Sequence, residues 1–302
     1  MPEFTRRSFV GASLASAAFA AAPKTAWSER LGVMCIFAAT EKPAREVLAA
    51  ARQAGFHRIQ MTFPWTKVDA GFLKGLPSWV QAEGLRCEAL GAYVNCVDPA
   101  AVLMNTRAED FAHALEYAAE LGSRRLVAWT GGYAPALMTP DERNFAPGAE
   151  DAIVRFLDPH LQRLEQARLQ LALESYITLA CPDAPSLRRL LDRLPPTVGA
   201  VLDPPNLTPL ARFPERDHVL GEMFRVLCGR ITVVHMKDFK LAKDGRSYEL
   251  PGALLGEMNY HLFADEIRAL PEPVPLIAEH IAPAAFAETR RKLLPIFEGG
   301  KV

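Results

Sequence analysis

The body of the sequence contains no run of about twenty apolar residues, which excludes an internal membrane-spanning helix. It also contains no basic stripe, because 34 Lys and Arg residues are balanced by 35 Asp and Glu residues. The electrostatic footprint of a nucleic-acid-binding protein is therefore missing. No internal repeat, low-complexity tract or linker divides the chain. A length of 302 residues with 50% hydrophobic content is typical of one large globular domain.

Motifs of several enzyme classes are missing as well. The first predicted strand is not followed by G-x-G-x-x-G, which argues against a dinucleotide-binding protein. The sequence has no nucleophile elbow and no phosphate-cradling loop, so hydrolysis by a Ser–His–Asp triad has no support. Cysteines are few, form no C-x-x-C pair and lie mostly in or beside apolar runs, which predicts small buried side chains. They are Cys35, Cys87, Cys96, Cys181 and Cys228.

The N-terminal segment differs from the rest of the chain. Residues 1–22 have a basic start with Arg6 and Arg7, an Ala-rich apolar middle and a small-residue region at 20–22. This order predicts a signal peptide with cleavage near its end. The arginine pair in TRRSFVG resembles the twin-arginine signal, so we expect export to the periplasm. A frayed amphipathic helix is the alternative. No cysteine lies there to carry a lipid, so no membrane attachment is expected after cleavage.

Short apolar runs alternate with amphipathic segments over residues 29–299. This alternation predicts an α/β fold, a single-domain (β/α)8 TIM barrel, with a doubly wound open sheet as the rival. The predicted strands are 31–37, 57–62, 85–93, 125–130, 169–176, 198–203, 231–239 and 276–279. The predicted helices are 43–54, 107–121, 151–168, 186–194, 263–270, 285–297 and the end of 208–229.

Acidic and imidazole side chains follow four consecutive predicted strands. Glu174, Asp203, His235 and Glu279 all stand at strand C-terminal ends, where the chemistry of such barrels collects. Burying a lone carboxylate is unfavourable, and three clustered carboxylates repel one another unless a cation lies between them. The pattern therefore predicts one divalent metal ion. Oxygen-rich ligation with one imidazole favours Mn²⁺ or Mg²⁺, with Co²⁺, Zn²⁺ or Fe²⁺ as alternatives, and we expect Mn²⁺.

The stretches LALES, VLDPPN, VVHMKD and LIAEH, in this order, resemble the sugar phosphate isomerase/epimerase family of xylose isomerase-like TIM barrels. That group includes ketose 3-epimerases, hydroxypyruvate isomerases, inosose dehydratases and, more distantly, endonuclease IV. The resemblance covers residues 31–297. It implies that Glu174, Asp203, His235 and Glu279 hold the metal. It also implies that the two glutamates are catalytic and move the substrate proton through a metal-stabilised enediolate.

The resemblance has departures that bear on the substrate. Many epimerases of the family carry His three residues after the metal-binding Asp, and here that position is Asn206. Lys237 shares a strand face with His235, which favours a substrate contact over an outer salt bridge. Glycines 131–132 allow either close approach of a substrate or a tight turn, and the aromatic candidates have general packing as their alternative. The predicted substrate-binding residues are Asn206, Lys237, Trp129, Phe37, Trp65 and His261.

These features together predict a metal-dependent isomerase or epimerase. The expected substrate is a small carbohydrate-like polyhydroxy carbonyl compound: a free sugar, a sugar acid or an inositol derivative. A dehydratase or lyase of the same group is a close variant. An endonuclease IV-like phosphodiesterase would need further His ligands on the second and third strands, and a non-catalytic exported sugar-binding barrel would not need both glutamates. No nucleic-acid partner is expected, and related barrels suggest a homo-oligomer.

Overall fold

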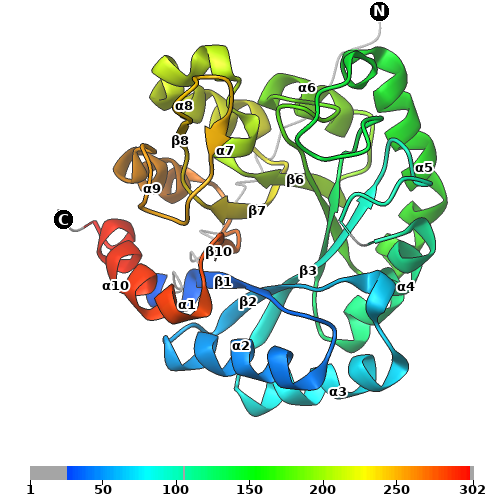
Figure 1. Ribbon diagram of the computed structural model, residues 1–302, viewed down its shortest axis with the longest axis vertical. Helices are drawn as coiled ribbons and strands as arrows, with labels where there is room; N and C mark the ends of the chain where they lie inside the picture. Colours follow the sequence, from blue (N-terminus) through cyan, green and yellow to red (C-terminus); the bar gives the residue numbers. More distant parts are fainter. Residues whose placement is uncertain (1–25, 105, 300–302) are drawn as a thin grey trace, which may run out of the picture.

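Eight parallel strands close into a barrel in the computed structural model, which describes residues 26–104 and 106–299 (Figure 1). Neighbouring strands follow the order β1-β10-β7-β6-β5-β4-β3-β2, and β1 pairs with β10 to close the ring. This arrangement confirms the predicted single-domain (β/α)8 TIM barrel and excludes the open doubly wound sheet. The strands are β1 (Leu31–Ile36), β2 (Arg58–Thr62), β3 (Arg86–Asn95), β4 (Arg125–Trp129), β5 (Gln170–Glu174), β6 (Val198–Leu202), β7 (Ile231–Met236) and β10 (Leu276–Ala278).

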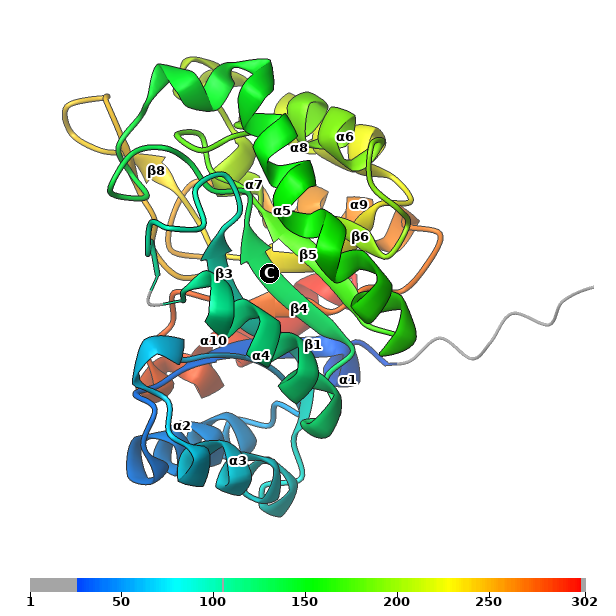
Figure 2. The same ribbon diagram turned by 90° about the vertical axis from the view of Figure 1, so that its right-hand side faces the viewer.

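The helices form a layer around the barrel, and Figure 2 shows α4 and α5 running along its outer side. The α-helices are α1 (Trp27–Arg30), α2 (Glu41–Gln53), α3 (Ala70–Ala82), α4 (Ala108–Glu120), α5 (Pro147–Gln166), α6 (Ala184–Leu191), α7 (Pro204–Leu207), α8 (Arg216–Leu227), α9 (Tyr260–Ala269) and α10 (Phe286–Phe297). Short 3₁₀ turns are η1 (Trp65–Lys67), η2 (Glu142–Phe145), η3 (Leu210–Glu215) and η4 (Pro283–Ala285). No helix in residues 26–299 is both long enough and apolar enough to cross a membrane.

Helix α3 is not among the helices that the sequence analysis predicts. Its sequence AGFLKGLPSWVQA contains two glycines and Pro77, residues that form helices poorly. The structure stabilises it with an N-terminal cap, in which the Asp69 side chain accepts a hydrogen bond from the backbone N of Phe72 at 2.7 Å. Packing of its buried face supplies the remaining stabilisation of the helix, because tertiary packing can outweigh a weak local helix propensity. The buried residues are Phe72, Leu73, Leu76 and Val80.

A short antiparallel hairpin follows β7 and consists of β8 (Lys240–Leu241) and β9 (Tyr248–Glu249). The sequence predicts only an extended loop here, with an exposed turn at residues 244–245. Gly245 has a φ of +66°, which supports that turn. The antiparallel pairing of β8 with β9, however, replaces the extended loop that the sequence predicts. Strands of two residues are too short to leave a recognisable hydrophobic alternation.

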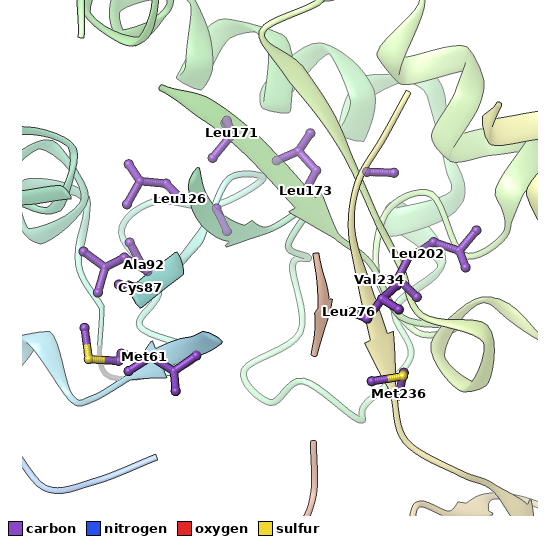
Figure 3. Packing of buried hydrophobic residues seen from close by; sticks show 14 of the residues in the cluster. Met61, Cys87, Ala92, Leu126, Leu171, Leu173, Leu202, Val234, Met236 and Leu276 are labelled. Carbon is purple, nitrogen blue, oxygen red and sulfur yellow. The ribbon is translucent and has the colours of Figure 1, made fainter. Parts of the chain in front are cut away.

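The outward faces of the barrel strands pack against the helices and form most of the hydrophobic core (Figure 3). In this core Leu171 and Leu173 of β5 alternate with inward residues, as expected for a strand covered by helices. Four of the five cysteines are buried, which confirms that prediction for them, while Cys228 is exposed and none forms a disulfide. Core residues labelled in Figure 3 are Met61, Cys87, Ala92, Leu126, Leu171, Leu173, Leu202, Val234, Met236 and Leu276.

Side chains on the inward faces fill the barrel interior in layers. The middle of the interior is apolar, while charged side chains lie toward both ends of the strands. Glu88 and its arginine partners lie at the N-terminal ends, and Glu174 and His235 lie at the C-terminal ends. The apolar layer therefore separates two charged clusters, and only the C-terminal one contains the predicted site. The layer includes Met34, Val127, Ala172, Val201, Val233 and Ile277.

Candidate metal centre

His235 lies at the centre of the C-terminal cluster. It is on β7 and is fully buried. Its Nδ1 atom is 3.3 Å from Oε2 of Glu279, 3.5 Å from Oε2 of Glu174 and 3.8 Å from Oδ2 of Asp203. The structure thus brings together all four residues that the sequence predicts as metal ligands.

Strand alternation explains why these four side chains converge. Glu174 is the last residue of β5, Asp203 directly follows β6, and Glu279 directly follows β10. The preceding residue in each case belongs to the outer core, namely Leu173, Leu202 and Ala278. Because consecutive strand residues point to opposite faces, packing of the apolar neighbour against the helices turns the polar side chain inward.

Two residues that the sequence analysis gives no site role hold the cluster in place. Gln60 on β2 contacts Nε2 of His235 through its Oε1 at 3.0 Å, and its Nε2 donates to the Tyr93 hydroxyl at 3.0 Å. Tyr93 in turn donates to Oε2 of Glu174 at 3.0 Å. A buried chain of hydrogen bonds therefore connects His235 to Glu174. The sequence signal was a single polar residue inside the apolar run of β2, RIQMT.

The chain of hydrogen bonds also fixes the imidazole of His235. Oε1 of Gln60 can only accept, so Nε2 of His235 carries a proton and donates it. Nδ1 is then the nitrogen that faces the carboxylates, and it has no hydrogen-bond partner although it is buried. Oδ1 of Asp203 is likewise buried without a partner. Unpaired atoms of this kind are rare in a folded interior and suit a ligand between them.

Lys237 and Asn206 complete the inner surface of the site. The Lys237 ammonium lies 2.6 Å from Oδ2 of Asp203 and 2.8 Å from Oε1 of Glu279, so its side chain points inward. Asn206 donates from Nδ2 to Oε1 of Glu174 at 2.9 Å. Both residues are nearly inaccessible to solvent, with 3% and 1% exposure. These contacts fix the orientation of three carboxylates that are proposed to bind the metal, those of Asp203, Glu279 and Glu174.

The pKa values in the cluster reflect opposing effects of burial and charge. Burial alone would raise the pKa of Asp203, but the positive charges of Lys237 and His235 hold it well below its usual value. Burial raises the pKa of Glu279, and Lys237 and His235 offset this only in part. Burial lowers the pKa of His235, yet the charges of Glu279 and Glu174 outweigh that effect and raise it to about 10. The charges of the carboxylates, His235 and Lys237 therefore oppose the effect of burial at each of these three groups.

The donor set fits a divalent cation. One ligand atom each from Glu174, Asp203 and His235 lies within 4.8 Å of the other two, and all three residues are buried. Carboxylate oxygens with one imidazole nitrogen are a usual ligand set for Mn²⁺ and related ions. Glu279 lies beside this group, in contact with both His235 and Lys237.

The remaining predicted site residues divide between the cluster and other places. Trp129 ends β4, and its ring centroid lies 5.1 Å from that of Tyr93, so it borders the cluster. Phe37 packs on Phe63, and Trp65 donates from its indole to the backbone O of Gly91. These two rings belong to the core between strands and helices, so the structure does not bring them to the cluster.

His261 also lies away from the cluster. It is on α9 and borders an outer cavity of about 410 Å³ together with Asp238 and Lys292. The LLGEMNY segment that precedes it packs against the residues that follow β7, where the backbone N of Met258 donates to Oδ1 of Asp238 at 2.9 Å. The amphipathic spacing of α9 explains this placement, because Phe263, Ala264 and Ile267 face the core.

A family profile described as "Xylose isomerase-like TIM barrel" matches residues 48–295 of the sequence. No curated protein matches the chain. Among solved structures, L-ribulose 3-epimerase has a TM-score of 0.66 at 16% identity, over 90% of this chain and 95% of that one. D-psicose 3-epimerase, solved in the presence of D-fructose, has a TM-score of 0.64 at 14% identity, over 90% and 100%.

An AP endonuclease of family 2 from Brucella melitensis shares the same fold. Its TM-score is 0.60 at 16% identity, over 83% of this chain and 92% of that one. Proteins with different named activities therefore share this barrel, so the reaction must be argued from the site.

Proposed function

Because this chain belongs to the xylose isomerase-like TIM barrel family, we propose that it is a divalent-metal-dependent sugar isomerase or epimerase. Its substrate would be a small polyhydroxy carbonyl compound such as a free sugar, a sugar acid or an inositol derivative. The structural likeness to proteins named as L-ribulose and D-psicose 3-epimerases supports this class of substrate.

One observation carries the proposal. Nδ1 of His235 is buried, has no hydrogen-bond partner and lies 3.3 to 3.8 Å from oxygens of three carboxylates. With Nε2 committed to Gln60, this nitrogen is the one free to bind a cation. Glu174, Asp203 and His235 would hold the ion, and Glu279 lies close enough to join them.

The chain's own groups can then carry the proton transfer. A bound divalent ion would act as a Lewis acid toward the substrate carbonyl. Both glutamates approach Nδ1 of His235, Glu174 from the last position of β5 and Glu279 from the position directly after β10. One carboxylate would remove the proton from the carbon beside the carbonyl, and the other would return it. Asn206 keeps Glu174 oriented for this role, and Lys237 does the same for Glu279.

The architecture gives less support to a phosphodiesterase. The second and third strands carry Gln60 and Tyr93 at the cluster, where that chemistry would call for additional His ligands. Both residues serve instead as hydrogen-bonding partners of the proposed ligands. Dehydration begins with the same proton removal as isomerisation or epimerisation, so these reactions can be distinguished only by their products.

Metal content is the first test. The purified protein, loaded with Mn²⁺ and dialysed, should retain about one ion per chain by elemental analysis. Glu174→Gln and Glu279→Gln should each lower this content. Glu88→Gln is the matched control, because Glu88 is a buried glutamate at the other end of the barrel. Absence of bound metal under every loading condition would contradict the proposal.

The reaction is tested by exchange of substrate hydrogen with solvent. A panel of free ketoses, sugar acids and inosose compounds in deuterium oxide, followed by NMR, should reveal deuterium at one carbon beside a carbonyl. Both glutamine variants should abolish this signal. An altered configuration identifies an epimerase, a moved carbonyl an isomerase, and an unsaturated product a dehydratase. A metal-loaded protein that exchanges no hydrogen with any of these compounds would favour the non-catalytic sugar-binding barrel.

A further inference from the structure

Arginines gather at the N-terminal face of the barrel, opposite the metal centre. Six of the eight barrel strands begin within two residues of an arginine, and the sequence places these arginines at the same end of parallel strands. They are Arg30, Arg58, Arg86, Arg124, Arg125, Arg168 and Arg230. We call three of them, Arg58, Arg86 and Arg125, the arginine cluster.

The arginine cluster surrounds a single carboxylate, that of Glu88. Oε1 of Glu88 accepts hydrogen bonds from Arg58 at 2.9 Å and from Arg86 at 2.6 Å, and Oε2 accepts one from Arg125 at 3.4 Å. Within residues 26–299 these three guanidinium groups have no other carboxylate partner. Each guanidinium carries five N–H donors, so one carboxylate satisfies only a small part of them.

The positive charge in excess is partly buried. Nε of Arg125 is inaccessible to solvent and has no hydrogen-bond partner, and the same holds for Nε of the nearby Arg30. Burial lowers the pKa of Arg125. Glu88 opposes this, whereas the charges of Arg124, Arg58 and Arg86 add to the lowering. Burial and the charge of Arg58 lower the pKa of Arg30. The arginines therefore repel one another around an acceptor that is too small for them.

A cavity opens directly beside these side chains. It has a volume of about 270 Å³ and is lined by Glu29, His57, Arg58, Gly84 and Arg86. The side chain of Arg86 is 60% exposed and that of Arg58 is 22% exposed, so both can reach a ligand from solvent. The cavity thus combines access and space with the side chains of Arg58 and Arg86, and the carboxylate of Glu29 is the one acidic group in its lining.

We propose that the arginine cluster is a binding site for a phosphate-type oxyanion. The forked guanidinium group matches the geometry of phosphate oxygens and binds them through paired hydrogen bonds. An anion in the cavity beside Arg58 and Arg86 would supply the acceptors that Glu88 alone does not. The same chemistry is offered by free phosphate and by the headgroup of an anionic phospholipid. This site is independent of the proposed reaction, because the apolar layer separates it from the metal centre.

Isothermal titration with inorganic phosphate tests the site. The wild-type protein should bind about one phosphate per chain, and Arg86→Gln should weaken binding about tenfold or more, since it removes a charge-assisted pair. Arg168→Gln is the control, because Arg168 is exposed on the same face and has no contact with Glu88. It should change the affinity less than about twofold. Absence of saturable binding, or equal weakening by both substitutions, would overturn the proposal.

Glu88→Gln distinguishes a binding site from a purely structural ion-pair cluster. If the arginines bind an anion, this variant should take up phosphate at least as tightly as the wild type, and phosphate should raise its Tm more. If the arginines serve only Glu88, the variant should lose stability and phosphate should not restore it, which would also overturn the proposal.

Vesicles identify the source of the anion once phosphate binding is established. Co-sedimentation with phosphatidylglycerol vesicles but not with phosphatidylcholine vesicles, reversed by phosphate, supports a phospholipid headgroup at this site. Phosphate binding without co-sedimentation supports a free oxyanion.

Discussion

Tyr93 shows how one hydroxyl group organises the metal centre. It donates to Glu174 and accepts from Gln60, and the other end of Gln60 holds His235. All of these groups are buried, so each lost hydrogen bond leaves a polar atom without a partner. Partners that orient metal ligands in this way usually contribute strongly to metal affinity.

Tyr93→Phe is therefore expected to weaken the site and the fold together. The free energy of unfolding, measured by urea denaturation, should fall by about 1–3 kcal/mol. The affinity for Mn²⁺, measured by titration calorimetry, should fall on the order of 10- to 100-fold.

A second tyrosine provides the control for this prediction. Tyr117 is also buried and donates to the backbone O of Leu73 at 2.7 Å, far from the cluster. Tyr117→Phe should lower stability and leave the affinity for Mn²⁺ unchanged. Equal Mn²⁺ affinity in Tyr93→Phe and in the wild type would show that the hydroxyl does not support the ligands.

At this scale the sequence reveals acidic residues more readily than their partners. Glu174 and Asp203 stand out because a carboxylate at the end of an apolar strand demands a cation or a donor. Gln60 and Tyr93 do not by themselves indicate a partner, since a neutral side chain inside a strand is compatible with many environments. Their role depends on which strands become neighbours across the barrel, and that information is not local.

Among the elements, the end of β4 shows how backbone geometry supports the site. Gly131 has a φ of +89°, and a Cβ atom there would lie 2.0 Å from Oδ1 of Asn95. Asn95 in turn bonds both the backbone N and O of Gly132. The glycines that the sequence left open between substrate approach and a tight turn thus form a turn packed on Asn95.

Gly131→Ala should destabilise the protein markedly. A left-handed backbone conformation costs an alanine about 1–2 kcal/mol, and displacing the buried Asn95 adds about 1–3 kcal/mol. Gly84→Ala is the matched control, because Gly84 has a φ of +63° but nothing within 4 Å of the added Cβ. If chemical denaturation gives both variants the same free energy of unfolding, the contact with Asn95 does not constrain the turn.

The strands and helices also show where a local sequence pattern is sufficient to predict an element. The eight barrel strands were predictable, because runs such as LVAW and VGAVL carry the continuous hydrophobicity of strands buried on both faces. Helix α3 was not, since its glycines and Pro77 hide a helix that packing and the Asp69 cap stabilise. The β8–β9 hairpin was missed because two paired residues leave no periodic signal.

For the whole molecule, we propose that residues 1–22, which lie outside the described part of the chain, direct export. Replacing Arg6 and Arg7 together by Lys keeps the charge but removes the arginine pair that the twin-arginine pathway requires. In a bacterial host, the wild-type protein should appear shortened in the periplasmic fraction, and the double-lysine variant should remain at full length in the cytoplasm.

Fractionation of the wild type in a host that lacks the twin-arginine translocase completes this test. Export that persists in this host, or in the double-lysine variant, would show that another route is used. Retention of the full-length wild type in a normal host would show that the segment is not a signal.

The apolar layer inside the barrel has a consequence for how this protein can change over time. No described ion pair joins the arginine cluster around Glu88 to the metal centre. The apolar residues Val127, Ala172 and Val201 lie between the two. Substitutions at the two ends should therefore combine additively, without compensating changes in the middle. A descendant of this barrel can therefore acquire a new reaction at the metal centre, while the proposed anion site at the opposite end is kept or lost independently.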